Sequence, residues 1–323
     1  MELLKKLTQC NAPSGCEKSI TDILKEELDG IADEVYTDVM GNLIAHKKGT
    51  GKKIMFAAHC DEIGIVVSYI DKNGFLRFSD VGGLYTKYLA GRRVRFKNGT
   101  IGVIGTEPKN DKNALSKMYI DIGAGSKEEA EQLVSIGDMA MFTGEFCDCG
   151  EHIVSKALDN RVGCYILIET LKTVNSDNDL YFAFTSQEEV GLRGARTAAY
   201  SIDPDYGIAV DVTDTGDTPE AEKMAVKLGG GAAIKVMDYS VICNVEVRQT
   251  LVGFARDNGV QYQLEIMKDG GTDAGVIQYA GNGVKTGGIS VPTRYIHSPS
   301  EMVSKSDIEE CIKLCRLFAE KAE

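Results

Sequence analysis

Acidic side chains and histidines stand directly after short apolar runs at several separate places in this chain. Lys53–Ala58 and Leu180–Thr185 are two such runs, and each is typical of a strand buried in a parallel sheet. The polar residues that follow runs of this kind are His59, Asp61, Glu188, Glu189, Asp211 and His297. Because ligands bind outside the carboxyl ends of the strands in open α/β sheets, we expect these side chains to converge. Asp159, at the start of a predicted helix, is expected to join them.

Five of these residues could form the ligand shell of two divalent ions. They supply two imidazoles and three carboxylates: His59, Asp159, Glu189, Asp211 and His297. Three crowded carboxylates would repel one another strongly without cations, and two divalent ions would more than offset their charge. A shared carboxylate holds two ions about 3.5–4 Å apart in two-metal hydrolytic sites. The pattern favours a metal site, and a structural cluster of polar residues is the alternative.

The elements that must position these residues alternate between helix and strand. Apolar spacing predicts helices over 160–174, 192–200, 241–258 and 273–279, and strands over 180–185, 206–210, 261–267 and 285–291. Helices are also predicted over 14–30 and 306–321, with capping boxes at 14–17 and 306–309. A hairpin is predicted over 34–46, with its turn at Gly41 and Asn42. This alternation predicts an α/β fold with a mostly parallel sheet and helices on both faces.

The region from about 68 to 155 has a different pattern. Short alternating strands surround the turn sequences Asn73-Gly74 and Asn98-Gly99, and one short helix is predicted over 127–134. These features predict a small all-β domain inserted into the α/β domain. We therefore divide the chain into a catalytic domain of residues 1–67 and 156–323, and an inserted domain of residues 68–155.

The net charge of the chain argues against two classes of binding partner, nucleic acids and anionic membranes. The 323 residues carry 36 basic and 48 acidic side chains, a formal net charge of −12. Phosphate binding needs a clustered excess of Lys and Arg, so we expect no nucleic-acid partner and no binding to an anionic membrane. No apolar run approaches the roughly 18 residues of a membrane-spanning helix. The N-terminal residues show no secretory pattern, and the nine cysteines fit reduced thiols, so we expect a cytoplasmic protein.

Six segments in order give the chain a specific family resemblance. They are Ala57–Gly64, Ala157–Arg161, Thr185–Gly191, Val210–Asp211, Gly270–Gly275 and Tyr295–Pro299. Together they resemble the tetrahedral (TET) dinuclear-metal aminopeptidases, a group that includes glutamyl and deblocking aminopeptidases and some relatives labelled cellulase-like. The resemblance covers essentially the whole chain, including the β insertion.

The resemblance implies a role for each site residue. Asp159 would bridge two metal ions, with His59 and Asp211 completing one site, and Glu189 and His297 completing the other. Glu188 would be the general base that takes a proton from the attacking water and delivers it to the leaving amine. Asp61 would orient His59 through its second ring nitrogen. Thr272 and Asp273 lie in a Gly-rich turn and are candidates to line the substrate site, although a turn and helix cap would explain them equally well.

The resemblance also implies a fold, cofactors and partners. The fold would be a phosphopeptidase-like α/β domain with a PDZ-like or barrel-like β insertion. The cofactors would be two divalent ions per subunit, zinc or cobalt, with manganese also possible because the same N/O ligands accept each. Short peptides would be the substrates. The chain would form homo-oligomers, from dimers to tetrahedral dodecamers, with the insertion contributing to assembly.

Several alternatives stay open at the level of sequence. A two-metal deacylase, deacetylase or carboxypeptidase could use the same scaffold. A glycosidase could use paired carboxylates, although adjacent residues at one strand end are poorly arranged to flank a glycosidic bond. A non-catalytic protein could bind peptides by strand addition to the β insertion, but the intact set of ligands and base argues against it. The preferred N-terminal residue, the physiological metal and the oligomeric state are not specified by the sequence.

Overall fold

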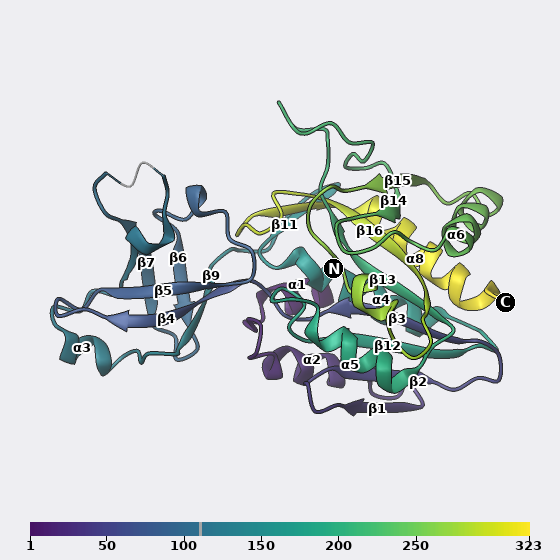
Figure 1. Cartoon of the computed structure of the whole chain (residues 1–323), viewed down its shortest axis with the longest axis horizontal. Helices are drawn as coiled ribbons and strands as arrows, with labels where there is room; N and C mark the ends of the chain where they lie inside the picture. The colour runs from purple at the N-terminus through teal and green to yellow at the C-terminus, as the bar shows by residue number, and fades with distance from the viewer. Residues whose placement is uncertain (110–111) are drawn as a thin grey trace.

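A long mixed sheet forms the centre of the computed structural model, which describes residues 1–109 and 112–323 (Figure 1). Its strands follow the order β1 (Glu34–Thr37), β2 (Leu43–Lys47), β12 (Asp179–Thr185), β3 (Lys53–His59), β13 (Tyr206–Thr213), β16 (Lys285–Arg294), β17 (Glu301–Ser304), β11 (His152–Ser155) and β10 (Cys147–Cys149). In addition, β14 (Ala232–Met237) pairs with β16, and β15 (Tyr262–Ile266) pairs with β14. The four central strands, β12, β3, β13 and β16, run parallel. The mostly parallel sheet is therefore confirmed, with antiparallel strands extending it on both sides.

Helices cover both faces of this sheet. On one face α4 (Leu158–Thr173), α6 (Val245–Asp257) and α8 (Lys305–Lys321) pack over the central strands, and α1 (Glu2–Gln9) and α2 (Lys18–Leu28) contribute to the same core. On the other face lie α5 (Arg193–Ile202) and α7 (Ala274–Ile277). The α5 helix buries Ala195, Ala198, Ala199 and Ile202, a spacing that makes one narrow apolar stripe. All eight residues of β13 are buried because the sheet is covered on both sides.

A second domain is a closed antiparallel barrel with its own apolar core. Its strands follow the order β4 (Gly64–Ile70), β5 (Leu76–Val81), β8 (Met118–Asp121), β7 (Ile101–Thr106), β6 (Arg93–Phe96) and β9 (Met139–Phe142). The short elements η1 (Thr86–Tyr88), η2 (Leu115–Lys117) and α3 (Lys127–Glu131) complete it. Figure 1 shows the barrel projecting from one end of the α/β body. Closure removes the free strand edges that an isolated sheet would expose.

Strand pairing divides the chain at different residues from those expected. The barrel strands lie between Gly64 and Phe142, whereas β10 and β11 pair with β17 in the large sheet. The sequence placed the division at 68 and 155 because β10 and β11 are short strands that resemble those of the barrel. Residues 110 and 111 of the expected insertion lie outside the described part.

Two predicted capping boxes are wrong. No side chain caps α2, and Ser14 instead donates its hydroxyl hydrogen to Asp61 Oδ2 at 2.7 Å. Likewise α8 begins at Lys305, and Asp307 accepts the backbone N–H groups of Gly229 and Gly231 at 2.7 Å each. A tertiary hydrogen bond thus replaces the predicted cap at Ser14. Ser306 instead lies inside α8, and its hydroxyl is 2.8 Å from that of Ser304. At α3 the local cap does form, since the Ser126 side chain accepts the Glu129 N–H.

The lengths of the helices and the state of the cysteines are two further features of the fold. In the part that the structure describes, no helix is long and apolar enough to cross a membrane. All nine cysteines are free thiols, and five of them are buried: Cys60, Cys164, Cys243, Cys311 and Cys315. Buried cysteines of this kind pack as small apolar side chains.

Candidate metal centre

The register of the parallel strands brings the first site residues together. His59 is the last residue of β3 and pairs with Thr185, the last residue of β12. On the other side, β3 pairs with β13 up to Ala57 and Ala209, so Asp211 continues alongside His59. Asp211 lies inside β13 rather than beyond its end, because β13 pairs with β16 as far as Thr213. The expectation that these residues share one edge of the sheet is confirmed.

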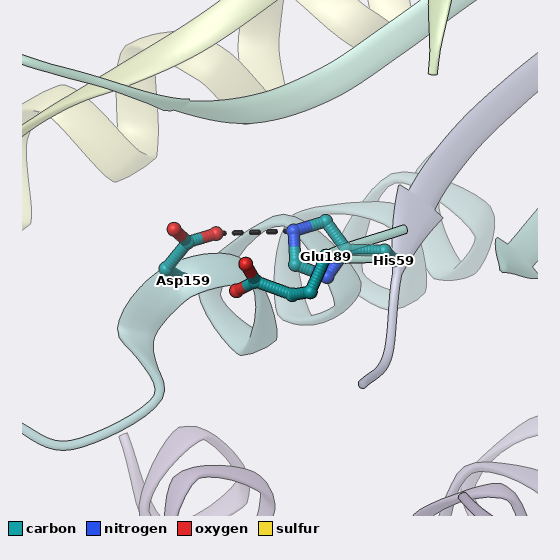
Figure 2. Close-up of side chains that lie close together, drawn as sticks. All are labelled: His59, Asp159 and Glu189. Atoms are coloured by element: carbon teal, nitrogen blue, oxygen red, sulfur yellow. Dashed lines mark hydrogen bonds and ion pairs between the residues drawn. The ribbon is translucent and has the colours of Figure 1, made fainter. Parts of the chain in front are cut away.

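The His59 imidazole lies at the centre of one group of carboxylates. Its Nε2 atom is 3.0 Å from Asp159 Oδ1, 3.7 Å from Asp211 Oδ1 and 3.8 Å from Glu188 Oε2. Only 2 % of His59 is exposed. Figure 2 shows Asp159, from the start of α4, pointing at the ring of His59. A buried imidazole therefore faces three carboxylates through a single nitrogen.

His297 lies at the centre of a second group. Its Nε2 atom is 3.4 Å from Asp159 Oδ2 and 3.3 Å from Glu189 Oε2. The residue follows β16 in a loop and has a left-handed backbone, with φ of 59°. Non-glycine residues in this conformation cost free energy and are found most often at functional sites. The two oxygens of Asp159 therefore face different histidines.

Asp61 supports the site mainly through the backbone. Its carboxylate accepts the N–H of Glu188 at 3.1 Å and the N–H of Glu189 at 3.3 Å. Its Oδ1 atom is 3.5 Å from His59 Nδ1, so a contact with the second ring nitrogen is present but long. Ser14 completes the shell of this fully buried carboxylate. Asp61 thus fixes both glutamates that follow β12.

Thr272 and Asp273 are buried beneath the site. Thr272 donates its hydroxyl hydrogen to Asp211 Oδ2 at 2.8 Å, and Asp273 Oδ2 accepts that of Thr185 at 2.6 Å. The glycines before them, Gly270 and Gly271, line a cavity of about 620 Å³ that opens over the site. The two side chains therefore hold site residues from behind, and direct contact with a substrate stays a prediction.

Burial and neighbouring charges shift the pKa values of the clustered carboxyl groups in opposite directions. Burial raises the pKa of Asp211 to about 7, and burial together with nearby carboxylates raises the pKa of Glu188 well above its usual value. Burial would raise the pKa of Asp159 as well, but hydrogen bonds to His297 and His59 lower it instead. For His297, burial opposes the charged form, yet Glu189 and Asp159 raise its pKa to about 12. The protein alone cannot keep every one of these carboxylates ionised.

The residues fit divalent cations. Within residues 1–109 and 112–323, no Lys or Arg forms an ion pair with the clustered carboxylates of Asp159, Glu188, Glu189 and Asp211. Glu189 Oε1 is buried and has no hydrogen-bond partner there. Two triads have ligand atoms close enough to share an ion: His59, Asp159 and Glu189, and His59, Glu188 and Asp211. Imidazole and carboxylate ligands suit zinc, cobalt and manganese.

The chain is similar throughout its length to known peptidases. A family model described as M42 glutamyl aminopeptidase matches residues 41–314. The chain belongs to this family. The family is metal-dependent, and its members are peptide hydrolases. The resemblance to TET aminopeptidases and the assignment as an enzyme are therefore confirmed.

Individual known aminopeptidases and peptidases match the chain almost end to end. A putative aminopeptidase of Acetivibrio thermocellus is 55 % identical over 97 % of this chain and 96 % of its own. The solved aminopeptidase of Desulfurococcus kamchatkensis has a TM-score of 0.95 and 41 % identity, covering 99 % of this chain and 94 % of its own. The TET1 peptidase of Pyrococcus horikoshii, which can assemble into a tetrahedron or a large octahedral shell, has a TM-score of 0.89 and 36 % identity over 99 % of both chains.

Some residues around the candidate site have no signal in the sequence that points to it. The pattern at Ser14 predicts a helix cap, and no motif marks Glu301, although it accepts the backbone N–H of both Asp159 and His297. Tyr85 and Gly83, from the barrel side, line the cavity near His297. None of these residues follows a continuous apolar run in the sequence, so the rule that selected the candidate ligands could not select them. Only the long-range fold brings them to the site.

Binding of divalent ions to the metal-free protein is expected to release protons. Below about pH 7 Asp211 keeps its proton in the folded protein, and Asp273, with a pKa of about 6, behaves similarly. Ligating carboxylates must be ionised, so affinity for Zn²⁺ or Co²⁺ should rise as the pH goes from about 5 to 7. Both pKa values are raised from the ordinary 3.8, so the metal-free protein should lose stability as the pH rises from about 4 to 7. Calorimetric titrations in buffers of different ionisation enthalpy measure the protons released, and a pH-independent affinity would contradict this prediction.

Proposed function

We propose that this chain is an aminopeptidase that removes the N-terminal residue of short peptides with two divalent ions and Glu188 as the general base. The observation that carries the proposal is the position of Asp159, whose Oδ1 is 3.0 Å from His59 and whose Oδ2 is 3.4 Å from His297. A carboxylate that faces two ligand groups in this way suits a bridge between two ions. Family membership supports the same reaction class.

The proposed ligand sets divide around that bridge. His59 and Asp211 join Asp159 in one set, and Glu189 and His297 join it in the other. This division follows the family resemblance and regroups the two triads described above. The distances of 3.7 Å from His59 to Asp211 and 3.3 Å from His297 to Glu189 are consistent with it. When bound, the ions would polarise the scissile carbonyl and lower the pKa of the attacking water. Zinc or cobalt is proposed, with manganese as a further possibility.

The protein's own side chains transfer protons and hold one another in position. Glu188 lines the cavity and, in this proposal, takes a proton from the attacking water and delivers it to the leaving amine. Burial raises the pKa of its carboxyl group in the metal-free protein, and bound cations would lower it towards the range of a general base. Asp61 holds Glu188 and Glu189 in place through their backbone N–H groups. Thr272 and Asp273 shape the substrate site indirectly in this proposal, by fixing Asp211 and Thr185.

Selection for a free N-terminus follows from the groups that line the site. A free amine could bind one of the ions through its lone pair, or donate a hydrogen bond to a lining carboxylate such as that of Glu188 or Glu189. An acetylated N-terminus has no such lone pair. Cleavage one residue from the free amine is therefore favoured over removal of acyl groups.

A panel of matched peptides tests the proposal. Each peptide is offered with a free and with an acetylated N-terminus, in the presence of Zn²⁺, Co²⁺ or EDTA, and the released residue is identified by mass spectrometry. We expect cleavage of the free set only, lost in EDTA and restored by metal. Cleavage of the acetylated set would indicate a deacylase, and cleavage from the other end a carboxypeptidase. No cleavage by fully metallated protein would favour a peptide-binding role.

We also propose that the chain forms a closed homo-oligomer through its barrel. The assembly of the Pyrococcus horikoshii relative and the projecting position of the barrel in Figure 1 support this proposal. Light scattering should then give a mass well above the 35.0 kDa of one chain, and a mass of one chain at micromolar concentration would contradict it. The nine free cysteines favour a reducing compartment, so we keep the cytoplasm as the proposed location, which cell fractionation can test.

A further inference from the structure

Glu301 joins two separate parts of the candidate site. It is the first residue of β17, and only 2 % of it is exposed. Its Oε2 atom accepts the backbone N–H of Asp159 at 2.9 Å, and its Oε1 atom accepts the backbone N–H of His297 at 3.0 Å. One carboxylate therefore ties together the backbones of two residues that are 138 positions apart in the sequence.

Neither of those N–H groups has a partner in regular secondary structure. Asp159 lies in the first turn of α4, where backbone N–H groups have no carbonyl partner within the helix, and its ψ of 105° is not helical. His297 lies in a loop with a left-handed backbone. The hydrogen bonds to Glu301 therefore hold both residues where local structure does not. The side chains they carry meet at the site, with His297 Nε2 3.4 Å from Asp159 Oδ2.

The surroundings of Glu301 differ from those of a buried carboxylate held by cations. Glu62, in the same region, pairs with Lys156 at 2.7 Å and with Arg161 at 3.5 Å. Glu301 has no such Lys or Arg partner in the described ranges 1–109 and 112–323. Burying a carboxylate without a cation is costly, and two backbone hydrogen bonds offset only part of that cost. Divalent ions at the neighbouring ligands would supply the missing positive charge.

We propose that Glu301 is a positioning residue for peptide hydrolysis, which sets the separation of Asp159 and His297 so that they can share a divalent ion. This inference rests on the proposed two-metal function. It predicts that Glu301 governs metal affinity through the backbone of the ligands without contacting the ion.

The test compares two substitutions of buried carboxylates. Glu301→Gln keeps the size of the side chain but replaces one acceptor oxygen by a donor, so one of the two backbone N–H groups loses its partner. Asp307→Asn is the matched control, because Asp307 is also fully buried and also accepts two backbone N–H groups, those of Gly229 and Gly231. Asp307 is not among the residues that line the cavity. Metal-stripped forms of the full chain are titrated with Co²⁺ or Zn²⁺ against a chromophoric chelator, and thermal unfolding and steady-state kinetics are measured in parallel.

We expect Glu301→Gln to weaken metal binding about 10–100-fold, the usual effect of losing a group that orients metal ligands. Its kcat should fall with little change in KM, since the substrate cavity is untouched. Asp307→Asn should lower the unfolding midpoint of the metal-free protein yet bind metal within about twofold of the parent.

Metal affinity of Glu301→Gln within about twofold of the parent would overturn the inference, whatever its unfolding midpoint. If Glu301→Gln does not fold, Glu301→Asp decides in the same titration: its carboxylate is too short to reach both N–H groups, so unchanged affinity would again overturn the inference. A parent protein that binds no divalent ion would refute the proposed function itself, which separates the two failures.

Discussion

Replacing Asp159 by asparagine is expected to leave no more than one tightly bound divalent ion and to slow peptide hydrolysis by about 10³-fold or more. The two oxygens of Asp159 face different histidines, and an amide offers only one oxygen and no charge. Metal ions contribute several kcal/mol of transition-state stabilisation, and each 1.36 kcal/mol corresponds to a factor of ten in rate. Metal content by elemental analysis and hydrolysis of an unblocked peptide, both on the full chain, measure the effect.

Asp307→Asn serves as the control for that change, because it makes the same chemical substitution at a buried carboxylate away from the cavity. It should keep the metal content and turnover of the parent protein. An Asp159→Asn protein that binds two ions and turns over normally would exclude Asp159 as the bridge. The two proposed ligand sets would then have to be drawn again without a shared carboxylate.

Exchange of Glu188 for glutamine is expected to lower kcat about 10²–10⁴-fold while the metal content stays that of the parent, since general base catalysis contributes about that much. Glutamine keeps the shape of the side chain but cannot accept a proton at neutral pH. The metal content is the decisive measurement, because Glu188 Oε2 also lies 3.8 Å from His59 Nε2 and could itself serve as a ligand. The pH profile of the residual activity should lose the ionisation of the base.

Glu189→Gln is the matched comparison, one residue along the same segment. Glu189 lies 3.3 Å from His297 Nε2 and has a buried oxygen without a partner among the described residues, so its loss should weaken metal binding. If Glu188→Gln loses metal and Glu189→Gln does not, the roles of the two glutamates are reversed. If Glu188→Gln retains full turnover, another group is the base.

The clustering of the candidate site residues could be predicted from the sequence because a simple topological rule selects them. His59 and Glu188 follow apolar runs typical of strands in a doubly covered sheet, and parallel pairing aligns the ends of those runs. The rule needs no side-chain detail. For this reason Asp211 reaches the cluster even though β13 continues beyond it, contrary to the predicted strand limit.

The groups that hold the ligands could not be predicted in the same way. Ser14 stands three residues before Glu17 and matches a capping box, yet its hydroxyl bonds to Asp61. Glu301 stands in no recognisable motif, yet it accepts the backbone N–H groups of Asp159 and His297. In the first case the local sequence suggests a partner that the tertiary fold replaces, and in the second it suggests none. The short strands β10 and β11 were assigned to the wrong domain for a related reason, since their partner β17 is distant in sequence.

The contact between the barrel and the candidate site limits which barrels can be joined to this α/β body. Gly82 and Gly83 directly follow β5. A Cβ atom at Gly82 would lie 3.1 Å from Glu189 Oε2, and one at Gly83 would lie 3.0 Å from the His297 ring. The ring of Tyr85 lies 6.3 Å from that of His297. A chimaera that takes its barrel from one relative and its α/β body from another must therefore match the segment 82–85 to the ligands of the body. Exchange of the barrel alone would change the chemistry of the site as well as the shape of the assembly.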